Sequence, residues 1–387
     1  MTPTTRRLLA IGAGFAVALG ASASAQISIL DLGTLPDSRY SVAADINDSG
    51  QVVGMADLAT GGSHAVLWQN GSLIDLGTLG SGTISWASAI NDREQIVGVS
   101  SLVLSSGDFA VVWQNGGIHN LGTLPGGNFS QAADINERGQ VVGVSNGPAG
   151  VVGVLWEAGT VRELRTASGD VLDYAEAIND SGQVVGALAG NRGVVWDAGT
   201  TIDLGALPGG TTAIPRDINN LGHVVGSADT ATGSHHAFLW DGGTIIDLGT
   251  LGGDRSVAFA INDHRHIVGT STTASGAEHA FLWRDGAMID LGTLPGGVHS
   301  SAHSINTHGQ IAGSSGTASG ETHAVVWTVA LVPTSKDDCK NGGYRGFGPP
   351  AGPFRNQGQC ISYVQSHSRM IPTMKAVTDR AARAKGM

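Results

Sequence analysis

Residues 247–283, DLGTLGGDRSVAFAINDHRHIVGTSTTASGAEHAFLW, decide the fold, because the same unit is written seven times along the chain. Its most constant element is an Ile-Asn pair, followed five residues later by two apolar residues and Gly, and then by a Trp. Successive asparagines are 40 to 45 residues apart, which indicates a solenoid, a propeller or an array. The seven asparagines are Asn47, Asn91, Asn136, Asn179, Asn219, Asn262 and Asn306.

Each unit contains four candidate strands. In the copy from Ser72 to Trp113 they are residues 73–76, 85–90, 95–99 and 109–113, separated by turns rich in Asn, Asp and Gly. No segment of the repeats shows a sustained helical period. Four short strands in about 44 residues are typical of a propeller blade, whereas a β-solenoid repeats about every twenty residues. The sequence therefore predicts an all-β, seven-bladed β-propeller of four-stranded antiparallel blades.

The two ends of the repeat array predict how the ring closes. An Asp-Leu-Gly motif or a variant precedes each Ile-Asn pair, but none follows the last repeat Trp, Trp327. We therefore expect the N-terminal segment 27–35 to supply the last strand of the last blade. This arrangement leaves no open sheet edge between the first and last blades.

The composite unit resembles the HAF repeat of secreted bacterial proteins. The clearest copies run from Asp203 to Trp240 and from Asp247 to Trp283, and the resemblance covers nearly all of residues 27–328. It implies an exported β-propeller. It implies no reaction and no ligand.

The N-terminus reads as a signal peptide over residues 1–25. Arg6 and Arg7 precede a short apolar run, and Ala23-Ser24-Ala25 is a small-residue cleavage site. The run is too short to span a membrane, and no later segment is apolar enough to do so. We expect a secreted, extracellular or periplasmic protein with a propeller over residues 26–333. Both ordinary secretion and twin-arginine export fit the arginine pair.

The repeats stop before a different C-terminal region. Residues 334–365 contain both cysteines and resemble a two-cysteine module found near the C-termini of exported bacterial proteins. We expect a Cys339–Cys360 disulfide closing a small loop, because exported proteins meet an oxidising compartment. Residues 366–387 are basic and are expected to form a mobile tail, with any helix starting after Pro372.

The charge distribution limits the partners. Residues 26–333 carry 10 Arg, no Lys and 29 acidic residues. Such an acidic body argues against nucleic acid, which requires a basic face. It fits an extracellular protein or glycan ligand. We expect a monomer with no cofactor.

Two repeated side chains and one motif receive structural rather than chemical interpretations. His64, His236, His279 and His323 could form a metal ring, but other blades place Phe109, Val152 or Arg192 at this position, so we expect buried histidines bonded to backbone or to a neighbouring blade. The repeat Trp residues are expected to pack between blades. The sequence Gly143-Val144-Ser145-Asn146-Gly147 matches a hydrolase elbow by letter, but no helix follows it. The sequence predicts no catalytic or metal site.

The two ends of the predicted blades differ in variability. The turns after Ile-Asn and after Trp are similar in all copies and lie at one end, while the loops before Ile-Asn and after Val-Val-Gly vary and lie at the other. Binding residues usually occupy loops on a rigid scaffold, although such loops also drift without function. Candidate ligand residues on the variable face are Arg39, Tyr40, Trp86, Phe129, Tyr174, Arg216, Arg255 and His299.

These features predict a secreted, non-catalytic binding or interaction module. One alternative is an extracellular glycan hydrolase or lyase that uses carboxylates on the variable face. A second alternative is a structural cell-surface or matrix protein. An enzyme requires converging acids, or an acid beside His or Tyr, at the channel mouth, and a binder requires exposed aromatic side chains.

Overall fold

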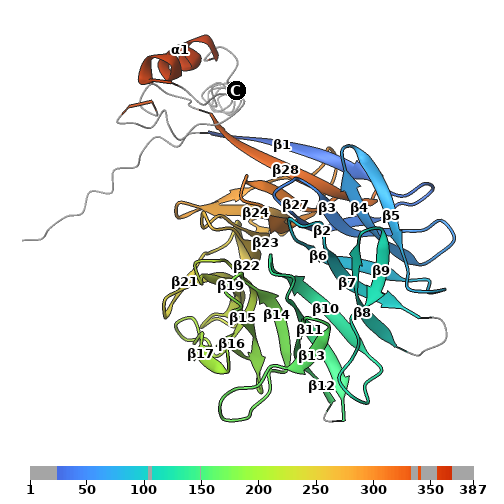
Figure 1. Ribbon diagram of the computed structural model, residues 1–387. Coiled ribbons are helices and arrows are strands. Elements are labelled where there is room, and N and C mark those ends of the chain that lie inside the picture. Colours follow the sequence, from blue (N-terminus) through green and yellow to red (C-terminus); the bar gives the residue numbers. More distant parts are fainter. Residues whose placement is uncertain (1–23, 103–106, 149, 333–338, 341–354, 368–387) are drawn as a thin grey trace, which may run out of the picture. The chain divides into compact units, whose positions relative to one another are not determined.

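The computed structural model describes residues 24–102, 107–148, 150–332, 339–340 and 355–367 (Figure 1). The compact unit Ser28–Thr328 contains the repeats, and the chain on both sides of it contributes to a second unit. Residues 1–23 of the predicted signal peptide and residues 368–387 of the predicted tail lie outside the described residues. Within the described residues, no helix combines the length and the apolar character needed to cross a bilayer.

The described repeats form seven antiparallel four-stranded sheets, as the sequence predicts. The first strands are β2 (Ser41–Ile46), β6 (Ser85–Ile90), β10 (Ser130–Ile135), β14 (Tyr174–Ile178), β18 (Ala213–Ile218), β22 (Gly252–Ile261) and β26 (Ser300–Ile305). The second are β3 (Val52–Asp57), β7 (Ile96–Ser101), β11 (Val141–Gly147), β15 (Val184–Leu188), β19 (Val224–Asp229), β23 (Ile267–Thr273) and β27 (Gln310–Gly316). The third are β4 (Ser63–Gln69), β8 (Asp108–Gln114), β12 (Gly150–Glu157), β16 (Arg192–Asp197), β20 (His235–Asp241), β24 (Glu278–Arg284) and β28 (Thr322–Val332). The fourth are β5 (Ser72–Gly77), β9 (Gly117–Asn120), β13 (Thr160–Glu163), β17 (Thr200–Asp203), β21 (Thr244–Asp247), β25 (Ala287–Asp290) and β1 (Ser24–Gly33).

The N-terminal strand closes the last blade. The seventh sheet has the order β1-β28-β27-β26, so its outermost strand comes from the start of the chain, as predicted. β1 begins at Ser24, two residues before the predicted mature N-terminus. One parallel bridge between Arg192 and Ala213 joins the fourth and fifth sheets and leaves each otherwise four-stranded.

The core lies between neighbouring blades. The cluster between the second and third blades combines Val97 and Val112 with Ile135 and Trp156, all buried. Six repeat Trp residues are at most 6% exposed, and Trp283 packs against its cluster partly buried, so the prediction that they pack between blades is confirmed. A single blade has no core of its own, because its apolar face is covered only by the next blade.

The Gly after each Val-Val pair is required by a close approach of two strands. A Cβ on Gly98 would lie 2.1 Å from the carbonyl oxygen of Trp86 on the first strand of the same blade. The other six copies show the same contact at 1.9 to 2.1 Å. The first strand has an irregular register at this level, for example between Ala87 and Ala89, so that one extra residue bulges. The Gly therefore makes room for a bulge that every blade repeats.

The asparagines of the Ile-Asn pairs form a closed ring of hydrogen bonds. Asn179 Oδ1 accepts the backbone N–H groups of Ser181 and Gln183 and so holds its own turn. Its Nδ2 also donates to the backbone oxygen of Asn219 in the next blade at 3.1 Å, a link that the sequence analysis missed. Every blade makes this link, and Asn306 Nδ2 returns to Asn47 O at 3.0 Å. Closure therefore involves the innermost strands as well as β1.

The prediction for the repeat histidines was wrong in its partner. Nδ1 of His279 lies 2.9 Å from Asp290 Oδ2, the Asp-Leu-Gly carboxylate on the outermost strand of the same blade. His64, His236 and His323 make the same pair with Asp75, Asp247 and Asp31, and the four histidine side chains are 17 to 23% exposed. The third and fourth strands lie beside each other, so both members of the pair point to one side of the blade.

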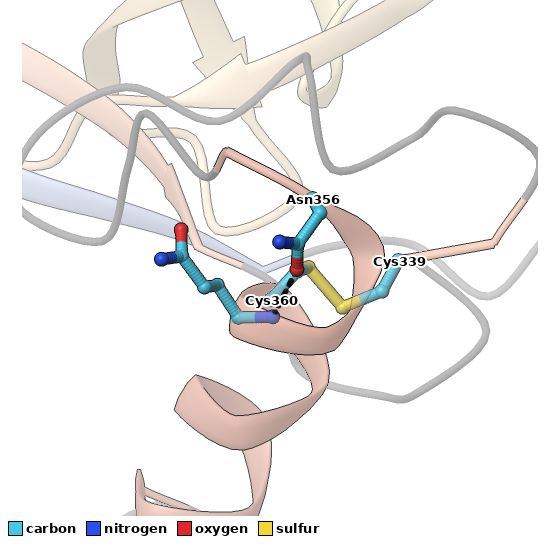
Figure 2. Close-up of a disulfide and its surroundings, with 4 residues drawn as sticks. Cys339, Asn356 and Cys360 are labelled. Atoms are coloured by element: carbon cyan, nitrogen blue, oxygen red, sulfur yellow. Dashed lines mark hydrogen bonds between the residues drawn. A yellow bond between two sulfur atoms is a disulfide. The ribbon is translucent and has the colours of Figure 1, made fainter.

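The two-cysteine region contains the predicted disulfide and an unpredicted helix. Figure 2 shows the Cys339–Cys360 bond, whose two cysteines are fully buried. Helix α1 (Gln357–His367) carries Cys360, whereas the sequence analysis predicted a loop. Asn356 caps the helix, because its Oδ1 accepts the N–H of Gln359 at 3.0 Å.

Candidate functional site

The seven first strands surround a central channel that contains two separate cavities. One cavity, of about 310 Å³, is lined by the Ile-Asn pair and the following residue of all seven blades. Its Ile and Asn are the same in each repeat, and it includes the asparagine ring. The other cavity, of about 460 Å³, is lined mainly by residues that lie two to five positions before the asparagines. We name this second space the channel cavity.

The channel cavity is diversified at one strand position. Three residues before each Asn, on the bulged part of the first strand, the side chains differ although the surrounding sequence repeats. All seven line the cavity. In blade order they are Ala44, Ser88, Ala133, Glu176, Arg216, Phe259 and His303.

The lining of the channel cavity differs around the ring. The first three blades contribute only Ala or Ser at the diversified position, whereas the next four contribute large side chains. The lining also reaches the second strand in the second and third blades, at Val99 and Val144. Trp86, Gln131 and Tyr174, each five residues before its Asn, line the cavity from the second, third and fourth blades. The small residues at the diversified position and the three side chains of Trp86, Gln131 and Tyr174 therefore belong to overlapping arcs of the ring.

A charged pair occupies one side of the cavity. Arg216 Nη1 lies 2.5 Å from Glu176 Oε1, across the boundary between the fourth and fifth blades. Tyr174 precedes Glu176 by two residues on β14, and burial together with the Glu176 charge raises the pKa of Tyr174. The pair leaves this wall nearly neutral.

His303 projects from the opposite arc. Its Nδ1 lies 2.7 Å from the backbone oxygen of Ala43, and its ring packs edge-on against Phe259 at 5.7 Å between centroids. Burial lowers the pKa of His303. The ring is therefore neutral, its Nδ1–H donates to Ala43, and its Nε2 is an acceptor.

Three carboxylates form inter-blade clips at the base of the cavity. Two residues before the Asn, the first, third and fifth blades have Asp45, Asp134 and Asp217, while the second, fourth and sixth have Ala. Each Asp accepts the N–H of the following Ile in its own blade and the N–H of the corresponding Ile in the next blade, at 2.7 to 2.8 Å. Seven blades cannot be paired completely, and the unpaired seventh has Ser304, whose Oγ donates to Asp45 at 2.5 Å.

These carboxylates titrate unusually. Burial raises the pKa of Asp134 to about 7 and that of Asp217 to about 6, and it also raises the pKa of Asp45. The hydrogen bonds from backbone N–H groups act in the opposite direction but are the smaller effect, and the carboxylates also repel one another. Within the described residues, no group of three or more His, Cys, Asp or Glu is arranged to hold a metal ion.

The structure divides the eight predicted ligand residues into those that line the channel cavity and those that do not. Trp86, Tyr174 and Arg216 line the channel cavity. The other five lie seven or eight residues before their asparagines and do not line it: Arg39, Tyr40, Phe129, Arg255 and His299. Of these, Arg39 lies 3.6 Å from Glu321, and Tyr40 is 37% exposed.

Sequence reasoning missed Gln131, Glu176, Phe259 and His303. A comparison of the seven copies position by position finds them, since the position three residues before Asn varies in size and charge within an otherwise repeated strand.

Comparisons with known proteins match the chain to solved structures at low identity but to no family. No family model matches it, and no curated protein does. TolB from Acinetobacter baumannii is 10% identical over 76% of this chain and 64% of its own, with a TM-score of 0.41. A puromycin-hydrolysing peptidase of Mycobacterium tuberculosis is 12% identical over 74% of this chain and half of its own, with a TM-score of 0.45. The Aleuria aurantia lectin is 11% identical over 66% of this chain and 98% of its own, with a TM-score of 0.35. At these scores the likenesses add nothing to the assignment of a function.

Proposed function

We propose that this chain is an exported, non-catalytic binding module whose ligand occupies the channel cavity. The observation that carries the proposal is the diversified position three residues before each Asn. The repeat Trp and the Gly after each Val-Val pair, which are fixed by packing, are the same in every copy. Here six residue types occupy seven copies of one position, and all face the same cavity.

The cavity has the properties of a small-molecule site. Its volume of about 460 Å³ lies within the usual range of roughly 300–1,000 Å³, and its wall combines aromatic rings with a few polar groups. The rigid ring of blades supplies the scaffold. Export is supported by the N-terminal signal pattern and by the Cys339–Cys360 disulfide, which is typical of oxidising compartments. Membership of the HAF-repeat secreted proteins belongs to the same proposal.

One observation favours a glycan hydrolase or lyase as a second candidate. Asp134 lines the cavity, and its pKa of about 7 suits a general acid. Against this role, both of its oxygens accept backbone N–H groups, and two other blades repeat the same arrangement. Because Asp45 and Asp217 make the same pair of backbone hydrogen bonds, linking neighbouring blades is sufficient to explain these carboxylates. We therefore prefer the binding module to the enzyme.

Ligand screening on a cavity-filled variant tests the proposal. The full chain would be screened by calorimetry against glycans, peptides and small organic ions. We expect saturable binding that Ala133→Phe abolishes, because the new ring fills the arc of small residues. Arg39→Ala, on the rim, is the control and is expected to bind normally. Binding that survives Ala133→Phe in a folded protein would contradict the proposal. Turnover of a bound glycan that Asp134→Asn abolishes would favour the second candidate.

A further inference from the structure

We infer that the ligand of the channel cavity is an uncharged sugar, held against Trp86 and Tyr174; the inference rests on the proposed function. It follows from which groups in the cavity already have partners and which do not. The argument concerns the described residues of the lining.

Most charged atoms of the lining already have partners. Each of the three Asp carboxylates accepts two backbone N–H groups, and Asp45 also accepts the Ser304 hydroxyl. Glu176 and Arg216 neutralise each other at 2.5 Å, while the buried Arg216 Nε–H has no partner among the described residues and can donate to a ligand hydroxyl. A charged ligand would have to compete with these internal partners before it gained a contact of its own.

Apart from Arg216 Nε, the uncommitted polar groups are neutral. No hydrogen bond to another described residue is formed by the Trp86 indole N–H, the Ser88 hydroxyl, the Gln131 amide or the Tyr174 hydroxyl, although all four residues line the cavity. His303 Nε2 adds a free acceptor, since Nδ1–H is donated to Ala43. Together they offer both donors and acceptors, which is what a set of hydroxyl groups requires because each hydroxyl both donates and accepts.

The aromatic rings suit the apolar face of a sugar. Trp86 and Tyr174 occupy the same strand position in the second and fourth blades, with Gln131 of the third blade between them. A pyranose ring has an apolar C–H face and an edge of hydroxyls. The rings can cover the face while Gln131 and the hydroxyls of Ser88 and Tyr174 bind the edge.

Charged ligands fit the cavity less well. An anion meets an acidic body of 29 acidic and 10 basic residues over 26–333, and the positive charge of Arg216, the one Arg of the described lining, is already balanced by Glu176. A cation would seek the three Asp groups, whose oxygens already accept hydrogen bonds.

Titration with matched ligands tests the inference. Neutral mono- and oligosaccharides, their uronic acid and amino sugar counterparts, a quaternary ammonium ion and an acidic peptide would be added to the full chain, with binding measured by calorimetry and Trp fluorescence. We expect saturable binding of neutral sugars, unchanged within two-fold between low and high salt because no ion pair forms. Trp86→Ala is expected to weaken it at least ten-fold and Trp86→Phe by less. Tyr40→Ala, an aromatic outside the cavity, is the matched control and is expected to leave affinity unchanged.

The outcomes separate the inference from the proposed function. Saturable binding of only charged compounds or peptide, abolished by Ala133→Phe, would overturn the sugar assignment and leave the binding cavity standing. If the affinity for neutral sugars is unchanged by Trp86→Ala but is lowered by Tyr40→Ala, both the sugar assignment and the binding cavity are overturned. No saturable binding by any member of the panel would also count against both.

Discussion

Removal of one link from the asparagine ring should destabilise the whole propeller. Asn179 is 3% exposed, and its side chain accepts the backbone N–H groups of Ser181 and Gln183 and donates to the backbone oxygen of Asn219 and to Gln183 Oε1. Asn179→Ala leaves these four groups without their partner. At about 1 kcal/mol for each hydrogen bond lost, we expect a loss of about 4 kcal/mol in the free energy of unfolding.

Urea denaturation followed by Trp fluorescence measures this loss, since a repeat Trp lies between every pair of blades. The control is Ser181→Ala in the same turn, because its side chain is exposed and only its backbone is used. The control should change the free energy of unfolding by less than about 0.5 kcal/mol, as surface substitutions usually do. If Asn179→Ala costs no more than the control, the ring carries no stability and the reasoning is refuted.

Three further predictions concern the blades. The folded-state pKa of Asp134 is raised to about 7, so the native state binds this proton more tightly than the unfolded chain does. The resulting stabilisation is present at low pH and is lost as the pH rises from about 4 to 7. Asp134→Asn should flatten that part of the measured stability–pH curve, and an unchanged slope would count against the raised pKa of Asp134. Gly98→Ala places a Cβ 2.1 Å from a backbone oxygen and should lower the free energy of unfolding, measured by denaturation, by more than about 3 kcal/mol. Gly116→Ala, at a residue with φ of 73° and open space around it, should lower it by about 1 kcal/mol. Equal losses would refute the argument that two strands approach closely at Gly98. A double-mutant cycle of His279→Phe and Asp290→Asn, which copies the neutral pair of the second blade, should give a coupling energy of about 0.5–1 kcal/mol, and a coupling near zero would show that the pair is incidental.

The fold was largely predictable because its information is local and repeated. The strand predicted at residues 85–90 is observed as β6 with the same bounds, since alternating burial and a following Asn turn mark it in the sequence. Closure by the first strand followed from the missing Asp-Leu-Gly after Trp327. Helix α1 was missed, because it is short and weakly amphipathic and its main local signal is the Asn356 cap.

The candidate site was predictable only in part. Divergence between copies selected Trp86, Tyr174 and Arg216, which line the channel cavity, but it also selected five rim residues. The sequence gives no measure of depth along the first strand. It also conceals the bulge beside the Val-Val-Gly glycine, which shifts the face on which the following side chains point.

The sequence by itself determined the number of blades, the strands within each blade and the strand that closes the ring, because turn residues and hydrophobic alternation act over a few residues. Only the tertiary structure decided which side chains meet around the axis. Glu176 and Arg216 come from strands 40 residues apart in consecutive blades, and His303 and Ala43 come from the last and first blades, which are neighbours only because the ring closes. The closed ring of seven blades also explains why Asp and Ala alternate two residues before the asparagines and why the seventh blade has Ser304. Each carboxylate accepts an N–H group from the next blade, and Ser304 donates to Asp45 of the first blade.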